Sequence, residues 1–469
     1  MGEDGGLLLV RLPDADTSGQ CRLSPYDLSC KGRSTPMLWF YDTVLDVEKL
    51  TAALEAVLAK GYAVLCGRYA APETEGGTPL AVDLNNKGVV LYLGTATVDT
   101  PHLPPYTEQP LSSAIQTQGY NTSAQTQWLP PKEPMDPDKG NPEAPILALK
   151  VTTISGACSG TAIGMLVQHG VVDADSMIVF MKNWAECYRG QETLSVPPSH
   201  DRRVEQWQLH GAECPPKPDA FRIRAVPAGE APLPEFVPVM PRIMGPQVCV
   251  LPIDKTTLST WKNEAQRATG TEDFLFSQDD VLTARVWRAL ARTRCEQLEI
   301  SCDSDEVTTC SRASNFRQRC SPALDEGYCA NGVCQVWTQM SVKELLREDE
   351  SMVAAVAKTL RTDLSAHTSE VVKQRAQWLS WQQRQGCRTI QMFDANALTF
   401  ILSSWMFDWE GADFNARPVG YDHAAHTPIV AVFVPRKGVG EGKLSGGVNV
   451  YTCGTEAAVK RFSELLLSK

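Results

Sequence analysis

Apolar positions in the first part of the chain follow two different periods. Between residues 46 and 59 they recur every three or four positions, which predicts an amphipathic helix. Aliphatic and β-branched runs at 89–93, 145–153 and 160–168 predict buried strands. The last of these runs leads directly into His169. Helices and strands that alternate in this way predict an α/β fold.

The same alternation returns after residue 242. It predicts a strand at 247–251, helices at 255–268 and 278–294, and strands at 429–434 and 448–452. Residues 196–242 hold ten prolines, each of which fixes φ and removes a hydrogen-bond donor, so we predict neither a helix nor a central strand there. The stretch 100–144, rich in Pro, Gln, Asn and Ser, predicts a long surface connection. The sequence thus predicts an N-terminal half at 1–195, a crossover linker at 196–242 and a C-terminal half at 243–469.

Composition narrows the classes of protein that this sequence can encode. The chain has 469 residues, with 44 Lys and Arg against 55 Asp and Glu, and its formal net charge of −11 argues against a nucleic-acid partner. No apolar run approaches the roughly 18 residues of a membrane-spanning helix, and the N-terminus lacks the basic segment of a secretory signal. We therefore expect a soluble, cytoplasmic protein with no membrane partner, and nothing in the sequence demands more than a monomer.

No metal site is predicted. The 15 cysteines lack paired C-x-x-C spacing, and the six between residues 295 and 334 do not match a zinc ribbon, which leaves reduced thiols or a redox-sensitive loop. His423 and His426 have the i, i+3 spacing of two ligands on a helix, but no nearby cysteine or second carboxylate completes the set.

His169 is the first candidate for chemistry. It ends a predicted strand, and Asp173 follows at a position where it can cap the next helix. With seven histidines and 55 acidic residues among 469, about one such spacing is expected by chance. The local pattern alone therefore leaves open a buried structural histidine as well as a catalytic base.

Further short patterns accompany this one along nearly the whole chain. They are Leu23-Ser-Pro-Tyr-Asp27, Leu65-Cys-Gly-Arg-Tyr69, Asn183-Trp-Ala185, Asn315-Phe-Arg-Gln-Arg-Cys-Ser-Pro-Ala-Leu-Asp-Glu-Gly-Tyr-Cys-Ala-Asn331, Ser403-Ser-Trp405 and Asp413-Phe414. Together with His169-Gly-Val-Val-Asp173, their order and distances resemble the BAHD acyltransferases, which transfer an acyl group from a coenzyme A thioester to an alcohol or amine. The resemblance implies a two-domain α/β fold of the chloramphenicol-acetyltransferase type, with mixed sheets flanked by helices and an active-site channel between the halves.

The resemblance also implies the chemistry. Acyl-CoA is the co-substrate, no cofactor is permanently bound, and His169 is the base that takes a proton from the hydroxyl or amine of a small acceptor. Histidine suits this task because its ordinary pKa of about 6.5 leaves it largely neutral at pH 7. The indole N–H of Trp405 is the candidate donor to the tetrahedral oxyanion. Candidate residues of the substrate or coenzyme channel are Ser403, Ser404, Phe414, Lys255 and Lys262, although the two lysines also fit solvated surface positions.

Asp173 is expected to be structural, because its offset from His169 on the turn into a helix directs it away from the imidazole. The resemblance implies a salt bridge to Arg317 or Arg319, and one of these arginines is instead a candidate partner of Asp413. A role for Asp173 as the acid of a catalytic triad is the alternative.

Two departures from the family motifs keep other functions open. Ala174 stands where the family usually has glycine, and residues 415–418 lack the glycines and tryptophan of the motif that Asp413 begins. The second departure puts coenzyme affinity in doubt and leaves a non-catalytic accessory or binding protein as one alternative. Another is a condensation-type acyltransferase that uses a carrier-protein thioester, although that class usually has a second histidine where this chain has Gln168.

Overall fold

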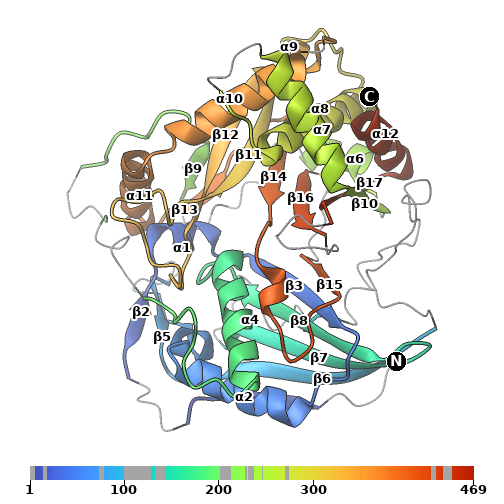
Figure 1. Cartoon of the computed structure of the whole chain (residues 1–469). Helices are drawn as coiled ribbons and strands as arrows, with labels where there is room; N and C mark the ends of the chain where they lie inside the picture. The colour runs from blue at the N-terminus through green and yellow to red at the C-terminus, as the bar shows by residue number, and fades with distance from the viewer. Residues whose placement is uncertain are drawn as a thin grey trace.

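The computed structural model consists of two halves of strands and helices that lie one above the other in Figure 1. It describes residues 6–13, 18–72, 79–99, 128–131, 143–200, 207, 213–227, 230, 237–245, 247–269, 274–349, 351–423, 429–436 and 446–468. Most of the stretch 100–144 and part of 196–242 lie outside these ranges. Within them, none of the helices combines the length and the apolar character needed to cross a membrane.

The lower half in Figure 1 is built on a six-stranded mixed sheet. In spatial order its strands are β1 (Leu7–Val10), β6 (Val89–Val98), β7 (Leu147–Gly156), β8 (Gly160–Gln168), β3 (Ser34–Tyr41) and β15 (Gly420–Asp422). β6 and β7 pair in parallel, and the other neighbours are antiparallel. Two helices, α2 (Val47–Ala59) and α4 (Ala174–Tyr188), pack together over one face of this sheet.

The upper half contains a second six-stranded mixed sheet. In spatial order its strands are β10 (Gln247–Ile253), β17 (Val448–Gly454), β16 (Val430–Pro435), β14 (Thr399–Ser404), β11 (Val307–Asn315) and β12 (Val333–Ser341). Its helical layer comprises α7 (Lys255–Ala268), α8 (Gln278–Leu298), α9 (Val342–Leu346), α10 (Met352–Ala366) and α12 (Glu456–Leu467). The predicted α/β class is confirmed in both halves.

Further elements complete the fold. They are α1 (Pro25–Cys30), η1 (Ala63–Cys66), η5 (Val237–Val239), α6 (Met240–Ile243), α11 (Ser369–Arg384), η6 (Trp409–Gly411), a three-stranded sheet of β2 (Gln20–Arg22), β5 (Ala81–Asp83) and β4 (Arg68–Tyr69), and a two-stranded sheet of β13 (Arg388–Gln391) and β9 (Ile223–Val226).

The prediction that residues 196–242 contain no helix is wrong. The one-turn helix α6 carries Pro241 in its first turn, where a missing N–H leaves no hydrogen bond unmade. The same stretch also contributes β9, which forms a two-stranded sheet with β13 among the described residues and is therefore not a central strand.

The two halves are interlocked through β15, which comes late in the chain but belongs to the lower sheet. Tyr421 pairs with Trp39 of β3 in antiparallel register. The Trp409 ring lies 5.1 Å from the ring of Tyr421 and 5.2 Å from that of Trp39. Burial of these large rings in one aromatic cluster stabilises the exchange of a strand between halves.

Candidate active site

His169 lies on the turn between β8 and α4, and its main chain is held from both sides. Its N–H donates to the carbonyl of Arg33 at 2.8 Å, and its carbonyl accepts from the Asn331 side-chain amide at 2.7 Å. A Cβ at Gly170 would lie 2.6 Å from the Tyr69 hydroxyl oxygen, so only glycine fits behind the histidine. The turn therefore has little freedom to move the imidazole.

Asn331 links this turn to α1. Its backbone N–H and its side-chain amide both donate to Oδ1 of Asp27, at 2.8 and 2.7 Å. Oδ2 of Asp27 accepts from the backbone N–H of Ser24 at 2.7 Å, within the capping box of α1. Both Asp27 and Asn331 are fully buried. The sequence motifs contain these residues, but sequence reasoning gave them no role, because their contact joins positions 304 residues apart.

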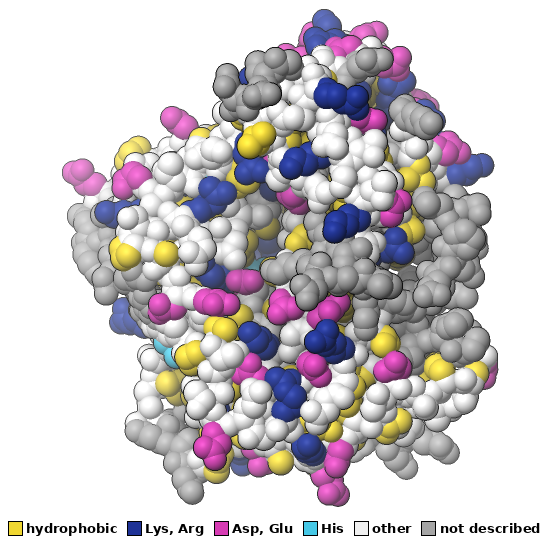
Figure 2. Space-filling view, in the orientation of Figure 1, with side chains coloured by type: hydrophobic (Ala, Val, Ile, Leu, Met, Phe, Trp, Pro, Cys, Tyr) yellow, Lys and Arg dark blue, Asp and Glu magenta, His cyan; other side chains and the backbone are white. Residues whose placement is uncertain are grey.

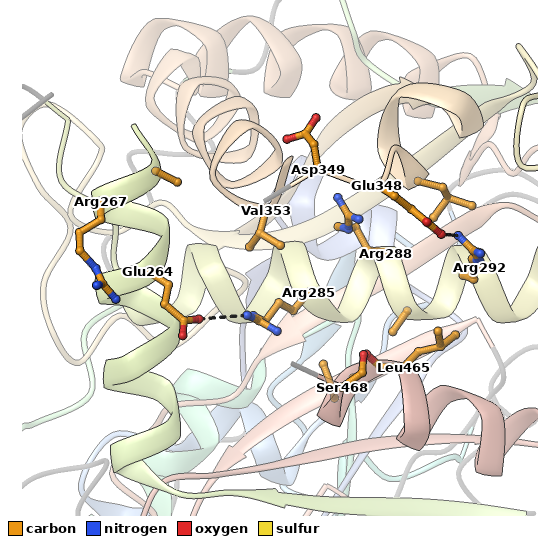
Figure 3. Close-up of a pocket in the computed structure, with 14 residues that line it drawn as sticks. Glu264, Arg267, Arg285, Arg288, Arg292, Glu348, Asp349, Val353, Leu465 and Ser468 are labelled. Carbon is orange, nitrogen blue, oxygen red and sulfur yellow. Dashed lines mark hydrogen bonds and ion pairs between the residues drawn. The ribbon is translucent and has the colours of Figure 1, made fainter. Parts of the chain in front are cut away.

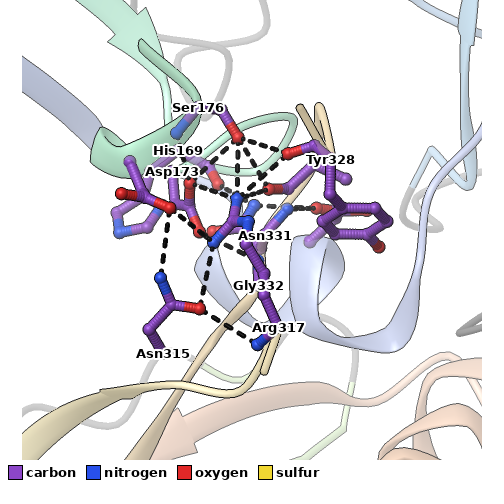
Figure 4. Close-up of polar contacts among 11 residues, drawn as sticks. His169, Asp173, Ser176, Asn315, Arg317, Tyr328, Asn331 and Gly332 are labelled. Carbon is purple, nitrogen blue, oxygen red and sulfur yellow. Dashed lines mark hydrogen bonds and ion pairs between the residues drawn. The ribbon is translucent and has the colours of Figure 1, made fainter. Parts of the chain in front are cut away.

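Asp173 points away from His169 and towards the upper half. Its two carboxylate oxygens accept from the two terminal guanidinium nitrogens of Arg317, each at 2.9 Å (Figure 4). The backbone N–H of Gly332 donates to Oδ2 at 2.8 Å, and a Cβ at this glycine would collide with the Arg317 guanidinium. The N–H and the hydroxyl of Ser176 donate to Oδ1 at 2.9 and 3.0 Å. Both oxygens of Asp173 are thus fully used.

Asp173 and Arg317 each stabilise the charged form of the other. Burial alone would raise the pKa of Asp173, but Arg317, Ser176 and Gly332 together hold it below the ordinary value. Burial likewise opposes the charge of Arg317, yet Asp173 raises its pKa. Each side chain is 4% exposed, so this is a buried bidentate salt bridge.

The other expected pairings of these charges are wrong. Arg319 donates to the carbonyl of Leu364 at 3.2 Å. Asp413 pairs with Arg417, four residues further along the chain, at 3.6 Å and near solvent. Neither Arg317 nor Arg319 meets Asp413 in the described part of the chain.

Cys30, the last residue of α1, interacts with the His169 imidazole, and each of the two groups shifts the pKa of the other. Burial lowers the pKa of His169, but charge attraction and hydrogen bonding to Cys30, with a smaller contribution from Asp173, raise it to about 9. Arg33 opposes this rise. Burial raises the pKa of the Cys30 thiol, whereas His169 and then Arg33 lower it, and the net shift is downward. Sequence reasoning missed Cys30 because nothing in its neighbourhood distinguishes it from the other cysteines.

Among the described residues, no carboxylate hydrogen-bonds Nδ1 of the His169 imidazole. Nδ1 of His169 is buried and has no hydrogen-bond partner among the residues that the structure describes. The triad alternative requires a carboxylate oxygen at this nitrogen, and Asp173 has none to offer.

Trp405 and the two serines before it lie at and just beyond the end of β14. The indole N–H of Trp405 donates to Oγ of Ser403 at 3.0 Å, which leaves the serine O–H free to donate. Ser404 hydrogen-bonds Asp279 of α8, whose pKa is raised by burial and lowered in part by this bond. Within the described ranges, no hydrogen bond joins His169 to Trp405.

Phe414 is a core residue and does not line a channel. It is 1% exposed, and three aromatic rings surround it edge-on, those of Tyr41 at 5.8 Å, Trp184 at 5.2 Å and Tyr188 at 5.4 Å. The expectation that this phenylalanine faces substrate or coenzyme is therefore wrong, because its whole surface is used in packing.

The remaining predicted residues lie elsewhere. Lys255 and Lys262 are on α7, in the helical layer of the upper half and apart from α4 in Figure 1. Lys255 is exposed, in agreement with the alternative of a solvated lysine. His423 is buried, with Nδ1 2.9 Å from Oδ1 of Asp422, and His426 lies outside the described residues. In the described ranges, no group of three or more His, Cys, Asp or Glu side chains is placed to hold a metal ion.

At both places where the sequence departs from the family motifs, the residues present suit their backbone conformations. Ala174 is the first residue of α4, a helical position that alanine accepts without strain. Asn415 has a φ of 61°, the left-handed conformation that glycine adopts freely and that asparagine tolerates better than most residues. The segment after Phe414 therefore still makes the turn that glycine favours.

The sequence of this chain matches a family model and several known proteins. The family model described as "Transferase family" matches residues 12–466. Hydroxycinnamoyltransferase 2 of Oryza sativa subsp. japonica is 26% identical over 311 residues, which are 65% of this chain and 66% of that protein. The chain thus spans slightly less than two thirds of this relative.

Solved structures share the fold. Vinorine synthase aligns with a TM-score of 0.65 and 17% identity, over 100% of this chain and 97% of that one. F. graminearum TRI101, solved in complex with coenzyme A and deoxynivalenol, aligns with a TM-score of 0.67 and 16% identity, over 95% and 97%. At these identities the likeness concerns the two-domain fold.

Proposed function

The chain belongs to the Transferase family, the BAHD acyltransferases, and we propose that it moves an acyl group from an acyl-CoA co-substrate to the hydroxyl or amine of a small acceptor. The observation that carries the proposal is the position of His169. Its turn is fixed by Arg33 and Asn331, and no described carboxylate or backbone group occupies its Nδ1. The likeness to a protein solved with coenzyme A supports a coenzyme A thioester as donor.

In the proposed reaction, neutral His169 accepts the proton of the acceptor O–H or N–H while the acceptor atom bonds to the thioester carbon. The carbonyl electrons move to the oxygen and return as the C–S bond breaks, so that coenzyme A leaves as a thiolate. The proton on the imidazolium then passes to this thiolate or to water. A positioned general base contributes roughly 10²–10⁴ in rate.

The same reaction needs a donor for the oxyanion. We assign this role to the Ser403 hydroxyl, polarised by the Trp405 indole N–H that it accepts. Hydrogen bonds in a chain strengthen one another, and one oxyanion donor is worth about 3 kcal/mol of barrier lowering. The indole N–H of Trp405, predicted from the sequence as the oxyanion donor, already donates to Ser403, so Trp405 in this scheme acts through the serine and is a positioning residue.

Asp173 and Arg317 take no part in proton transfer in this proposal. Their salt bridge fixes the start of α4, and with it the turn that carries His169, against the loop after β11. The role is structural, in line with the saturation of both carboxylate oxygens.

A direct test is to incubate the protein with acetyl-CoA, hydroxycinnamoyl-CoA and further acyl-CoAs, together with panels of alcohols and amines. Release of the coenzyme thiol is followed with a chromogenic disulfide, and the acylated product is identified by mass spectrometry. Acceptor-dependent thiol release by wild type, and none by His169→Ala, is expected. Equal activity of His169→Ala would rule out the histidine as base.

A further inference from the structure

A cavity in the upper half lies apart from all of these residues. It has a volume of about 1010 Å³ and lies between α7, α8, α10 and α12 (Figure 3). Ligand pockets in proteins commonly enclose roughly 300–1,000 Å³, so the space is ample for a small molecule. None of the residues that line it belongs to the His169 site.

Three arginines of one helix line this cavity. Arg285, Arg288 and Arg292 are spaced by three and four residues along α8, which places them on the same face of the helix. This concentration is local. On the face shown in Figure 2, basic and acidic side chains are interspersed, and the chain as a whole carries a net charge of −11.

The acidic side chains around the cavity are more exposed than the arginines. Glu264 lies 3.4 Å from Arg285, and their side chains are 48% and 17% exposed. Glu348 lies 3.1 Å from Arg292, and the exposed fractions are 79% and 29%. Ion pairs of this exposed kind contribute little, about 0–1 kcal/mol. The carboxylates can therefore turn into solvent at small cost, whereas the arginines stay in the cavity.

Arg288, between the other two, is short of acceptors. One of its nitrogens donates to the carbonyl of Arg347 at 3.1 Å, but it forms no ion pair with a described residue. Its Nη1 and Nε of Arg285 are buried donors that lack a hydrogen-bond acceptor within the described ranges, whereas Nε of Arg292 lies 3.7 Å from a carboxylate oxygen of Glu296. Burial lowers the pKa of Arg288 and of Arg285, and the nearby carboxylates, Asp349 for Arg288 and Glu264 for Arg285, offset this shift only in part.

We propose that this cavity is a second ligand site, which binds a small molecule through a phosphate or diphosphate group held by Arg288, Arg285 and Arg292. Guanidinium groups present several donors in a planar fork that matches the oxygens of a phosphate. Val353 of α10 and Leu465 of α12 form apolar walls for the rest of the molecule. The site shares no residue with the His169 site and does not depend on the proposed function.

Titration with inorganic pyrophosphate, by isothermal calorimetry at low ionic strength, tests the proposal. Wild type is expected to bind it saturably, and Arg288→Gln to bind it at least about tenfold more weakly, because a charge-assisted hydrogen bond is lost. The matched control is Arg384→Gln, which removes an exposed arginine of α11 outside the cavity and should bind as wild type does.

A second variant, Val353→Asp, places a competing carboxylate at the cavity wall and should also weaken binding about tenfold or more. If Arg288→Gln does not fold, the affinity of Val353→Asp for pyrophosphate tests the proposal by itself. Absence of saturable binding to wild type overturns the proposal. So does binding that is unchanged in the folded cavity variants, because the anion then occupies another site, such as the proposed coenzyme site.

Discussion

The two terminal nitrogens of Arg317 donate to the two carboxylate oxygens of Asp173, Nη1 to Oδ2 and Nη2 to Oδ1, each at 2.9 Å. Asp173 caps α4 in the lower half, and Arg317 follows β11 in the upper half. The pair is buried, so it ties the two halves together directly behind the turn of His169.

Asp173→Ala should therefore lower the free energy of unfolding by more than the loss of an exposed salt bridge would. Removal of one partner strands the other charge, at a cost of about 3–5 kcal/mol in the free energy of unfolding. Urea denaturation measures this loss. Asp413→Ala, which breaks an exposed pair with Arg417, is the control and should cost at most about 1 kcal/mol.

The same pair predicts a pH dependence of stability. Because the pKa of Asp173 is lower in the folded protein, its carboxylate stabilises the fold above the ordinary pKa of about 3.9. This stabilisation is lost as the pH falls through the folded pKa, and Asp173→Asn should lack that component of the acid transition. An Asp173→Ala variant of full stability and no activity would instead indicate a catalytic role.

Phe414→Ala should destabilise the lower half. Truncation of a buried phenylalanine among three aromatic rings leaves a cavity and costs about 3–5 kcal/mol. Affinity for coenzyme A should stay within about twofold in the folded fraction, as expected for a residue with no exposed surface. Thermal denaturation and calorimetry with coenzyme A measure the two effects. A stable variant that binds coenzyme A much more weakly would contradict this account and indicate that Phe414 lines the coenzyme channel.

Periodicity predicted the elements of this fold well where side chains alternate between core and solvent. The helix expected at 255–268 is α7 with the same bounds, and the strand expected at 160–168 is β8. The exchange of β15 into the lower sheet could not be predicted, because three residues carry no period and their pairing partner is hundreds of positions away. The division of the chain at 196–242 stays a prediction.

Long-range contacts also limited the prediction of the site. The resemblance to the family implied a salt bridge from Asp173 to Arg317 or Arg319, and only the structure identifies Arg317 as the partner. The contact between Cys30 and His169 joins a short helix to a strand end, and no local pattern signals it. The prediction that Phe414 lines the channel is wrong for the same reason. Its apolar character fits a core and a channel equally well, and only its long-range contacts distinguish the two.

Cys30 should govern the pH dependence of turnover. Only the neutral imidazole can accept a proton, so kcat/KM of wild type should rise with pH through a midpoint near 9, the pKa of His169 in the free protein. Cys30→Ala removes the group whose charge and hydrogen bond raise the pKa of His169, and burial and Arg33 then move the midpoint to lower pH. A pH profile of thiol release from pH 6 to 10 reports both midpoints. Identical midpoints in the two proteins would contradict this account.

Ser403 and Trp405 should act as one unit. Ser403→Ala removes the proposed oxyanion donor and should lower kcat by about 10²-fold or more, with KM little changed. Trp405→Phe keeps an aromatic ring but deletes the N–H that polarises Ser403, so a smaller loss is expected. In the double variant the losses should not multiply, because the indole acts through the serine. Fully multiplicative losses would indicate two independent donors.

The central claim is acyl transfer from coenzyme A thioesters with His169 as base, and binding and turnover of acyl-CoA by wild type and His169→Ala test it most directly. His200→Ala, an exposed histidine, is the matched control. The account predicts saturable acyl-CoA binding to all three proteins with nearly equal melting temperatures, and acceptor-dependent release of coenzyme A by wild type and His200→Ala only. Failure of every acyl-CoA to bind wild type would contradict it.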